Sequence, residues 1–277
     1  MKASNLVISS VAKLELASVE WPIFDIAVSA ASYPFLYSDH DWTDLGALAI
    51  PQFPDTVGTL RNWEQMFVCG SQTDTLALLK DLSVGVSEAA RYQSRDEEGT
   101  QTPLETLSRG WGSCRDLAVL FTEAARVLGF GARIVSGYLY NPNQQRVGSG
   151  GTGSTHAWAE IFVPGAGWIT FDPTNRSLGG FNLIPIAVAR DIRQIAPVSG
   201  SYIGGTNAFA GMSVEVLVTS LLATEQLLCC KPIVSEQPRA AQRRGSIKSP
   251  IAIALQQAFA LPASRHIGTS QQPSSDF

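Results

Sequence analysis

Residues 111–129 read WGSCRDLAVLFTEAARVLG, and this stretch carries the signals for both ends of one amphipathic helix. Ser113 is a good N-cap, and Asp116 three residues later completes a capping-box pattern. Gly129 suits the C′ position, where a left-handed backbone commonly ends a helix. The apolar residues between these signals recur on one helical face: Leu117, Leu120, Phe121, Ala124 and Leu128. The stretch therefore predicts a helix with Cys114 in its first turn.

Downstream of this helix the pattern changes to strands. Residues 132–140 are typical of a strand, and 156–163 and 168–172 follow as two more, joined by the tight turn 164–167. If the last two strands pair, His156 and Asp172 lie near the same end of the hairpin. Glu160 then either faces solvent or pairs with an arginine such as Arg133. A helix followed by antiparallel strands is an α+β arrangement.

Upstream, apolar residues at intervals of three and four predict a helix within residues 73–92, and 103–107 form a short helical turn. Residues 6–8 and 23–28 are strand material, broken up by several prolines. We expect three parts in the chain. Residues 1–60 are the remnant of an N-terminal β-rich region with an extended linker, 61–220 are the catalytic core, and 221–277 are a loosely ordered C-terminal extension.

Composition excludes several classes of protein. The net charge of −4 comes from interspersed acids and bases, unlike the basic face of a nucleic-acid binder. No apolar run approaches the roughly 18 residues that span a bilayer, and the first 16 residues lack a signal-peptide pattern. The four cysteines match neither a disulfide framework nor a zinc-ligand spacing. We expect a soluble, cytoplasmic protein that needs no metal or cofactor and binds neither nucleic acid nor membrane; its oligomeric state leaves no signal.

Cys114, His156 and Asp172 have the side chains of a nucleophile, its base and the group that orients the base. A helix N-terminus favours thiolate over thiol, and its free N–H groups can hold an oxyanion. Cys114 would attack a carboxamide or peptide carbonyl, and His156 would protonate the leaving amine or ammonia. The resulting thioester would be hydrolysed by water or pass its acyl group to an amine.

Each of these residues also has a plainer interpretation. Cys114 alone could be a buried structural thiol, His156 an ordinary strand residue, and Asp172 a turn former before proline. Asp116 is a rival carboxylate, which we interpret mainly as a capping residue. A metal site is disfavoured because Cys114 and His156 lack further ligands in local spacing.

Substrate contacts are expected from residues beside the nucleophile and the base. Trp111 could line the site or donate its indole N–H, and Ser113 precedes the nucleophile directly. Trp158 lies two residues from His156 on the same strand face. Either tryptophan could instead be a core aromatic.

The sequence from Gln101 to Asn175 resembles the transglutaminase-like core, in its bacterial branch. The likeness is carried by QTPLETL (101–107), GSCRD (112–116), VSGYLY (135–140), STHAWAE (154–160) and FDPT (171–174). It implies a papain-like α+β fold with Cys114, His156 and Asp172 as the triad. Bacterial relatives usually carry a β-rich domain before this core, and we expect residues 1–60 to hold only a remnant of it. The chain lacks the carboxylate-dense loop that calcium regulation, known in animal transglutaminases, would need.

The resemblance and the residues together predict a transglutaminase-like cysteine protease or amidase. It would cleave amide, peptide or isopeptide bonds of a peptide or protein substrate through a thioester acyl-enzyme. One alternative is a protein-glutamine γ-glutamyltransferase, in which an amine takes the acyl group. Another is a non-catalytic binding module that keeps the fold.

Overall fold

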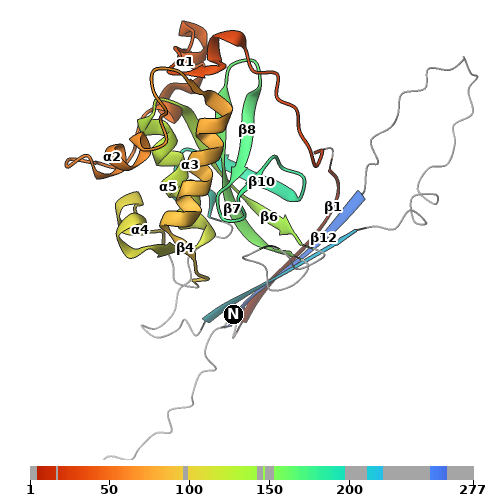
Figure 1. The fold of residues 1–277 in the computed structure, drawn as a ribbon. Helices are drawn as coiled ribbons and strands as arrows, with labels where there is room; N and C mark the ends of the chain where they lie inside the picture. Colours follow the sequence, from red (N-terminus) through yellow and green to blue (C-terminus); the bar gives the residue numbers. More distant parts are fainter. Residues whose placement is uncertain are drawn as a thin grey trace, which may run out of the picture.

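The computed structural model describes residues 5–16, 18–95, 99–141, 146, 153–196, 211–220 and 250–260. The helices lie together on one side of the main sheet (Figure 1). They are α1 (Asp39–Leu45), α2 (Thr59–Gln65), α3 (Thr75–Ala89), α4 (Pro103–Arg109) and α5 (Cys114–Val127), with short 3-10 turns η1 (Val28–Ala30), η2 (Gly46–Ala49) and η3 (Ile192–Ile195). The helices predicted within 73–92, at 103–107 and after Ser113 are thus confirmed as α3, α4 and α5.

The main sheet has five antiparallel strands in the order β10-β6-β7-β8-β9. They are β6 (Gly131–Tyr140), β7 (Gly153–Val163), β8 (Gly167–Asp172), β9 (Ser177–Leu178) and β10 (Leu183–Ala189). The predicted hairpin is confirmed, because Val163 pairs with Gly167 and Ala159 with Phe171. The predicted pair of Arg133 and Glu160 also forms, with 2.7 Å between Nη2 and Oε2. Helix α5 packs on β6 and β7, so the fold is α+β as expected.

Helix α5 is the centre of the hydrophobic core. Every residue from Asp116 to Arg126 is buried, because strands cover one side of the helix and α2, α3 and α4 pack around the other. The ring of Phe121 lies 5.3 Å from that of Phe171 on β8. Burying one large apolar side chain contributes about 1.5–3 kcal/mol, so this packing fixes α5, and with it Cys114, against β7 and β8.

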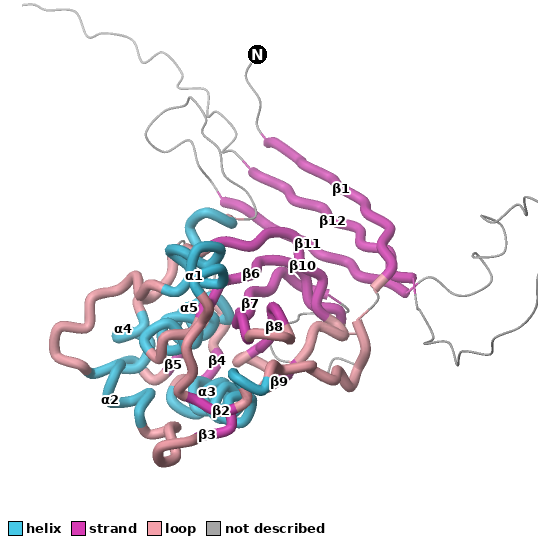
Figure 2. The backbone as a smooth tube through the Cα atoms, turned by 90° about the horizontal axis from the view of Figure 1, so that it is seen from above, coloured by secondary structure: helices cyan, strands magenta, loops and turns pink. Residues whose placement is uncertain are grey.

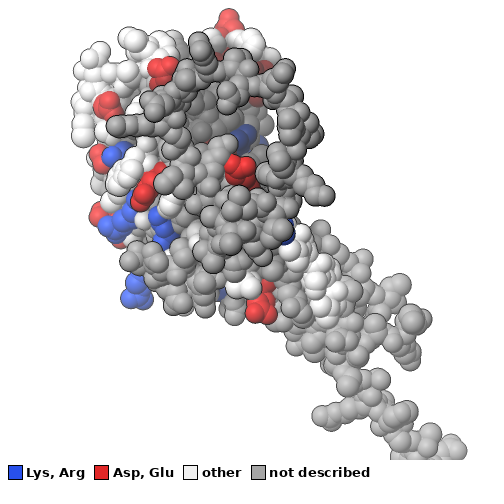
Figure 3. Space-filling model, turned by 90° about the vertical axis from the view of Figure 1, so that its right-hand side faces the viewer, with Lys and Arg blue, Asp and Glu red and all other residues white. Residues whose placement is uncertain are grey.

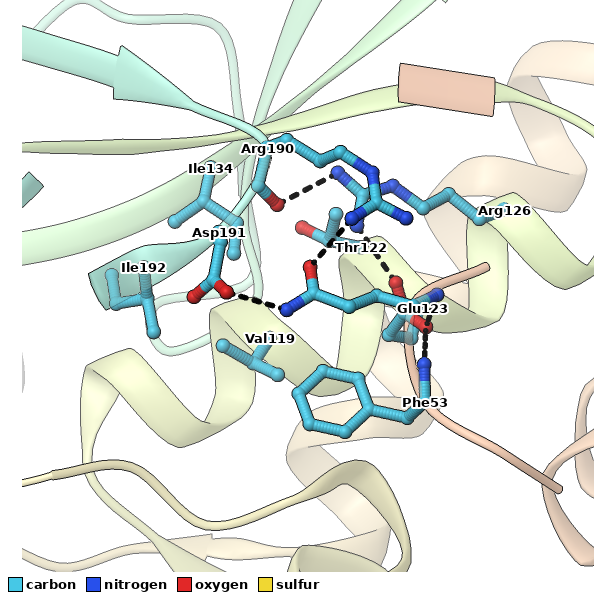
Figure 4. A pocket seen from close by; sticks show the side chains of 10 residues that line it. Phe53, Val119, Thr122, Glu123, Arg126, Ile134, Arg190, Asp191 and Ile192 are labelled. Atoms are coloured by element: carbon cyan, nitrogen blue, oxygen red, sulfur yellow. Dashed lines mark hydrogen bonds and ion pairs between the residues drawn. The ribbon is translucent and has the colours of Figure 1, made fainter. Parts of the chain in front are cut away.

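The C-terminal half of α5 is held by a buried ion pair (Figure 4). Arg126 Nη1 lies 2.7 Å from Glu123 Oε1, and both side chains are 1% exposed. The other oxygen of Glu123 accepts the backbone N–H groups of Gln52 and Phe53, while Arg126 donates to the carbonyls of Ala132 and Arg190. A buried pair needs such additional partners to offset its desolvation. The pair thus ties α5 to the segments before α2 and after β10.

One prediction for the N-terminal region is wrong. Residues 23–28 form no strand: they run as an extended loop into η1, and Ile23 is 97% exposed. The β-branched composition is that of a strand, but neither neighbouring segment pairs with it. The loop is attached instead by a bond from Ala27 N–H to the Pro164 carbonyl in the β7–β8 turn.

A second sheet joins segments that are far apart in the sequence. Its order is β1 (Asn5–Glu15), β12 (Pro250–Ala260) and β11 (Gly211–Ser220), all antiparallel (Figure 2). Val218 of β11 is fully buried and packs with Tyr138 and Ile184 of the main sheet. Of the extension 221–277, the structure describes β12. The other residues of that extension lie outside the described residues, as does the stretch 148–152, whose glycine, serine and threonine residues are typical of a flexible loop.

Two short pairings complete the described fold. Strand β2 (Ser32–Tyr33) pairs with β3 (Thr73–Asp74), and β4 (Arg91–Tyr92) runs parallel to β5 (Trp111–Gly112) directly before α5. Where described side chains are visible on the face in Figure 3, basic and acidic groups lie next to one another. Within the described ranges, no helix is long and apolar enough to cross a membrane.

Candidate active site

Cys114 is the first residue of α5, and its position is set by the residues on either side. The N–H and Oγ–H of Ser113 both donate to Asp116 Oδ2 at 2.8 Å, which closes the predicted capping box. A Cβ on Gly112 would lie 2.8 Å from the Asp116 Cβ, so only glycine fits there. Cys114 as a residue is half-buried. Its thiol lies at the N-terminus of α5, where the free N–H groups favour a negative charge.

Asp116, the rival carboxylate, is committed to fixing this helix start. Its side chain is fully buried, and Oδ1 accepts the backbone N–H of Gln101 at 2.7 Å and pairs with Arg95 Nη2 at 3.0 Å. Together with the two bonds from Ser113, these contacts occupy both oxygens. The structure therefore gives Asp116 a capping and tethering role, in agreement with the sequence interpretation.

Asp172 is the carboxylate that meets the imidazole. His156 enters from β7 and Asp172 ends β8, so the hairpin brings His156 Nε2 to 2.9 Å from Asp172 Oδ2. Both side chains are fully buried. The carboxylate also accepts the backbone N–H groups of Thr174 and Asn175 on Oδ1 and the Asn175 carboxamide on Oδ2. Because Asp172 is the acceptor, Nε2 of His156 carries the proton and Nδ1 is left for another partner.

Besides Asp172, Cys114 also interacts with the His156 ring. Nδ1 of that ring is buried and makes no regular hydrogen bond within the described residues. Burial alone would raise the pKa of the Cys114 thiol. The thiol also interacts with His156 and with the N–H of Ala157, and these two interactions outweigh burial and hold the pKa below its ordinary value. The site thus stabilises a thiolate beside an imidazolium.

The imidazole of His156 and the carboxylate of Asp172 shift each other's pKa in opposite directions. Burial favours neutral His156, yet Asp172 and then Cys114 overcome it and raise the pKa of His156 to about 10. Burial likewise opposes charge on Asp172, but the charge of His156 and the bonds from His156 and Asn175 hold the pKa of Asp172 below its usual range. The three groups therefore titrate as one coupled unit.

The three expected substrate contacts occupy different environments. Trp111 is partly exposed, three residues before Cys114, and the Arg109 guanidinium lies 5.8 Å from its ring centre. Ser113 is 4% exposed, with its hydroxyl bonded to Asp116. Trp158 is 1% exposed and lies against the His156 ring, with ring centres 6.1 Å apart. Trp111 is therefore accessible to a ligand, whereas Ser113 supports the helix start and Trp158 supports the imidazole.

Two residues near the site were not singled out from the sequence. Asn175 donates to Asp172 at 2.8 Å. Gln101 is 4% exposed, and neither its carboxamide oxygen nor its nitrogen has a hydrogen-bond partner in the described part of the chain. Its backbone is tied to Asp116, two residues from Cys114. A buried amide without partners costs about 1–3 kcal/mol per group, so this placement calls for an explanation.

Comparison with known families finds the same region. Residues 62–173 match the model of the core domain of the transglutaminase-like superfamily. One curated relative is an uncharacterised protein, ML0607 of Mycobacterium leprae (strain TN), 36% identical over 101 residues. The match covers 36% of each chain, so it spans about a third of the length of that relative.

Among solved structures, similarity extends to a candidate cysteine protease from Cytophaga hutchinsonii. It is 18% identical, with a TM-score of 0.49, and the match covers 69% of this chain and 72% of that one. LapG of Legionella pneumophila, in its EGTA-treated form, has a TM-score of 0.34 at 14% identity over 52% of this chain and 78% of that one.

Proposed function

We propose that the chain is a cysteine-dependent hydrolase of amide, peptide or isopeptide bonds in a peptide or protein substrate. Residues 62–173 match the model of the transglutaminase-like superfamily, which supports the proposal. The observation that carries the proposal is the coupling of three side chains. His156 holds the pKa of the Cys114 thiol down, and Asp172 bonds the far nitrogen of the same ring at 2.9 Å. This arrangement supplies a nucleophile, a base and an orienting group.

In the proposed reaction, the Cys114 thiolate attacks the carbonyl carbon of the substrate. The C–S bond forms as the carbonyl π electrons move onto oxygen. His156, protonated on Nδ1, then donates that proton to the leaving nitrogen as the C–N bond breaks, which yields an amine or ammonia and a thioester. Neutral His156 next takes a proton from water as the water oxygen attacks the thioester carbon. The C–S bond then breaks, which releases a carboxylic acid and returns Cys114 to the thiolate and His156 to the imidazolium. Asp172 stays ionised throughout and keeps the Nε2 proton in place.

The oxyanion of each tetrahedral intermediate needs hydrogen-bond donors. The proposal assigns this role to the backbone N–H of Cys114, in the first turn of α5, and to the carboxamide of Gln101. The support for Gln101 is its buried, unpartnered carboxamide and the tether of its backbone to Asp116. One such donor typically lowers the barrier by about 3 kcal/mol.

A glutaminyl peptide incubated with a labelled primary amine tests whether water or an amine accepts the acyl group. We expect ammonia release without a matching amount of amine incorporation, and no turnover by a Cys114→Ala variant. Amine incorporation that outruns hydrolysis would instead assign the chain as a γ-glutamyltransferase. Absence of turnover on glutaminyl and protein substrates, together with an unactivated Cys114, would favour a binding module.

A further inference from the structure

The turn after β8 is closed by backbone donors. Thr174 N–H and Asn175 N–H donate to Asp172 Oδ1, at 3.0 and 3.3 Å. This is the hydrogen-bond pattern by which an aspartate side chain mimics a backbone turn, and it needs no particular side chain at the two donor residues. The turn therefore does not explain why an asparagine stands at position 175.

The side chain of Asn175 bonds the other carboxylate oxygen of Asp172, Oδ2. Its Nδ2 donates to Asp172 Oδ2 at 2.8 Å, and that oxygen also accepts Nε2–H of His156 at 2.9 Å. Oδ2 thus has one donor from the imidazole and one from the turn. Because the carboxamide of Asn175 bonds Oδ2 independently of the imidazole, it can hold this oxygen in place when the ring moves.

The χ2 torsion of aspartate is broad, so the orientation of its carboxylate is set by the hydrogen bonds to its two oxygens together. A neutral donor at 2.8 Å narrows that distribution without neutralising the charge, and a hydrogen bond to a charged group is stronger than one between neutral groups. The burial of Asp172 excludes water from this task.

We propose that Asn175 is a positioning residue: its carboxamide holds Asp172 Oδ2 where it receives the Nε2–H of His156, and so keeps Nδ1 directed at Cys114. This inference rests on the proposed function, since it concerns the orientation of the same imidazole. Asn175 acts through Asp172 and has no assigned contact with substrate.

The test measures the rate at which iodoacetamide alkylates Cys114, as a function of pH, by mass spectrometry of the peptide that carries it. The proteins are the wild type, Asn175→Ala, Asn175→Asp and the control Asn182→Ala. Asn182 is the control because its carboxamide, like that of Asn175, donates to one oxygen, here the Tyr140 carbonyl at 3.3 Å. Thermal unfolding is recorded for all four.

For Asn175→Ala we expect an alkylation rate at pH 6 about tenfold below the wild type, because the imidazole spends less time oriented toward the thiolate. For Asn175→Asp we expect the acid limb of the profile to move up by about one pH unit, since a second carboxylate faces the site and disfavours the thiolate. Asn182→Ala should change only the unfolding temperature.

Two other outcomes overturn different statements. If wild-type Cys114 is activated but both Asn175 variants keep the wild-type profile, the positioning role is wrong and the proposed function stands. If wild-type Cys114 reacts no faster than the same cysteine in denatured protein, the proposed function fails and the positioning role fails with it.

Discussion

Asp172 and Asp116 are both buried carboxylates near the thiol, but their partners differ. Asp172 bonds the imidazole and accepts three donors from its own turn, whereas Asp116 bonds Ser113, Gln101 and Arg95. The first therefore acts on the charge of His156, and the second acts on the start of α5. Replacing each by its amide separates the two roles.

For Asp172→Asn we expect turnover to fall by on the order of 10²–10⁴, because the amide cannot hold the imidazole tautomer or its charge. Without the carboxylate the pKa of His156 falls, so the pH range between the titration of Cys114 and that of His156 narrows. Stopped-flow alkylation across pH checks this. Asp116→Asn should lower the unfolding temperature yet keep the pH profile; an unchanged profile in Asp172→Asn would contradict the assignment.

Gln101 offers a second test at the scale of one residue. Gln101→Ala should lower kcat on an amide substrate by roughly 10²-fold, the loss typical of one oxyanion donor. Alkylation of Cys114 by iodoacetamide forms no oxyanion, so its rate should stay within about twofold of the wild type. Equal losses in both reactions would mean that the substitution has disturbed Cys114 itself, and the oxyanion role would be withdrawn.

At the scale of elements, β6 is placed so closely to its neighbours that one position tolerates no side chain. Gly137 pairs with His156 across the β6–β7 ladder. A Cβ there would lie 2.0 Å from the Ile184 carbonyl oxygen and 2.8 Å from the Trp158 ring. The Trp158 ring also stacks on the His156 imidazole. A change in the spacing of β10, β6 and β7 at Gly137 would therefore shift Trp158 and, with it, the imidazole.

Gly137→Ala should therefore destabilise the protein by about 1–3 kcal/mol, the usual effect of overpacking, and should lower the alkylation rate of Cys114 as well. Chemical denaturation measures the first quantity. Gly180→Ala is the control, because a Cβ at Gly180 meets its nearest neighbour, Ser18 Oγ, at 3.6 Å, an ordinary contact. Equal stability of the two variants would show that β6 and β10 separate easily.

At the scale of the whole molecule, one buried acid links stability to pH. Glu64 on α2 is 0% exposed, and its Oε2 has no hydrogen-bond partner in the described structure. Burial, partly offset by a bond from Gln65, raises the pKa of Glu64 from 4.5 to about 8. The folded protein thus keeps a proton that the unfolded chain loses above about pH 4.5. Between these two values the free energy of unfolding falls as pH rises.

Glu64→Gln should remove this loss. Near pH 5 the variant and the wild type should have similar unfolding free energies, and by pH 8 the variant should be the more stable by on the order of 3 kcal/mol. Denaturation at both pH values checks the difference. Glu88→Gln, on the exposed surface of α3, is the control and should follow the wild type at both pH values. If the unfolding free energies of Glu64→Gln and the wild type change in parallel between pH 5 and pH 8, Glu64 is ionised in the folded protein.

Local signals in the sequence predict much of this fold. Ser113 with Asp116 marks the start of α5, Gly129 marks its end with φ 95°, and the turn at 164–167 sets the register that brings His156 to Asp172. These features depend on residues close together in the chain, so periodicity and turn chemistry suffice to predict them.

Contacts between distant segments are what the sequence pattern leaves undetermined. The order β1-β12-β11 joins the two ends of the described chain, and no local rule selects it. Residues 23–28 have strand composition but lack a pairing partner, and Trp158 has the sequence position of a ligand contact but is 1% exposed. The unpartnered carboxamide of Gln101 is likewise visible only once α4 and α5 are packed.

In the proposed reaction, Cys114 forms a covalent acyl intermediate with help from His156. A single turnover with an activated acyl ester, quenched in acid and analysed by intact mass and peptide mapping, detects this intermediate. We expect one acyl group on Cys114 in the wild type, formed much more slowly in His156→Ala and absent from Cys114→Ala. An acyl group on another residue, or acylation of Cys114 at the rate of an unfolded thiol, would show that Cys114 is not an activated nucleophile.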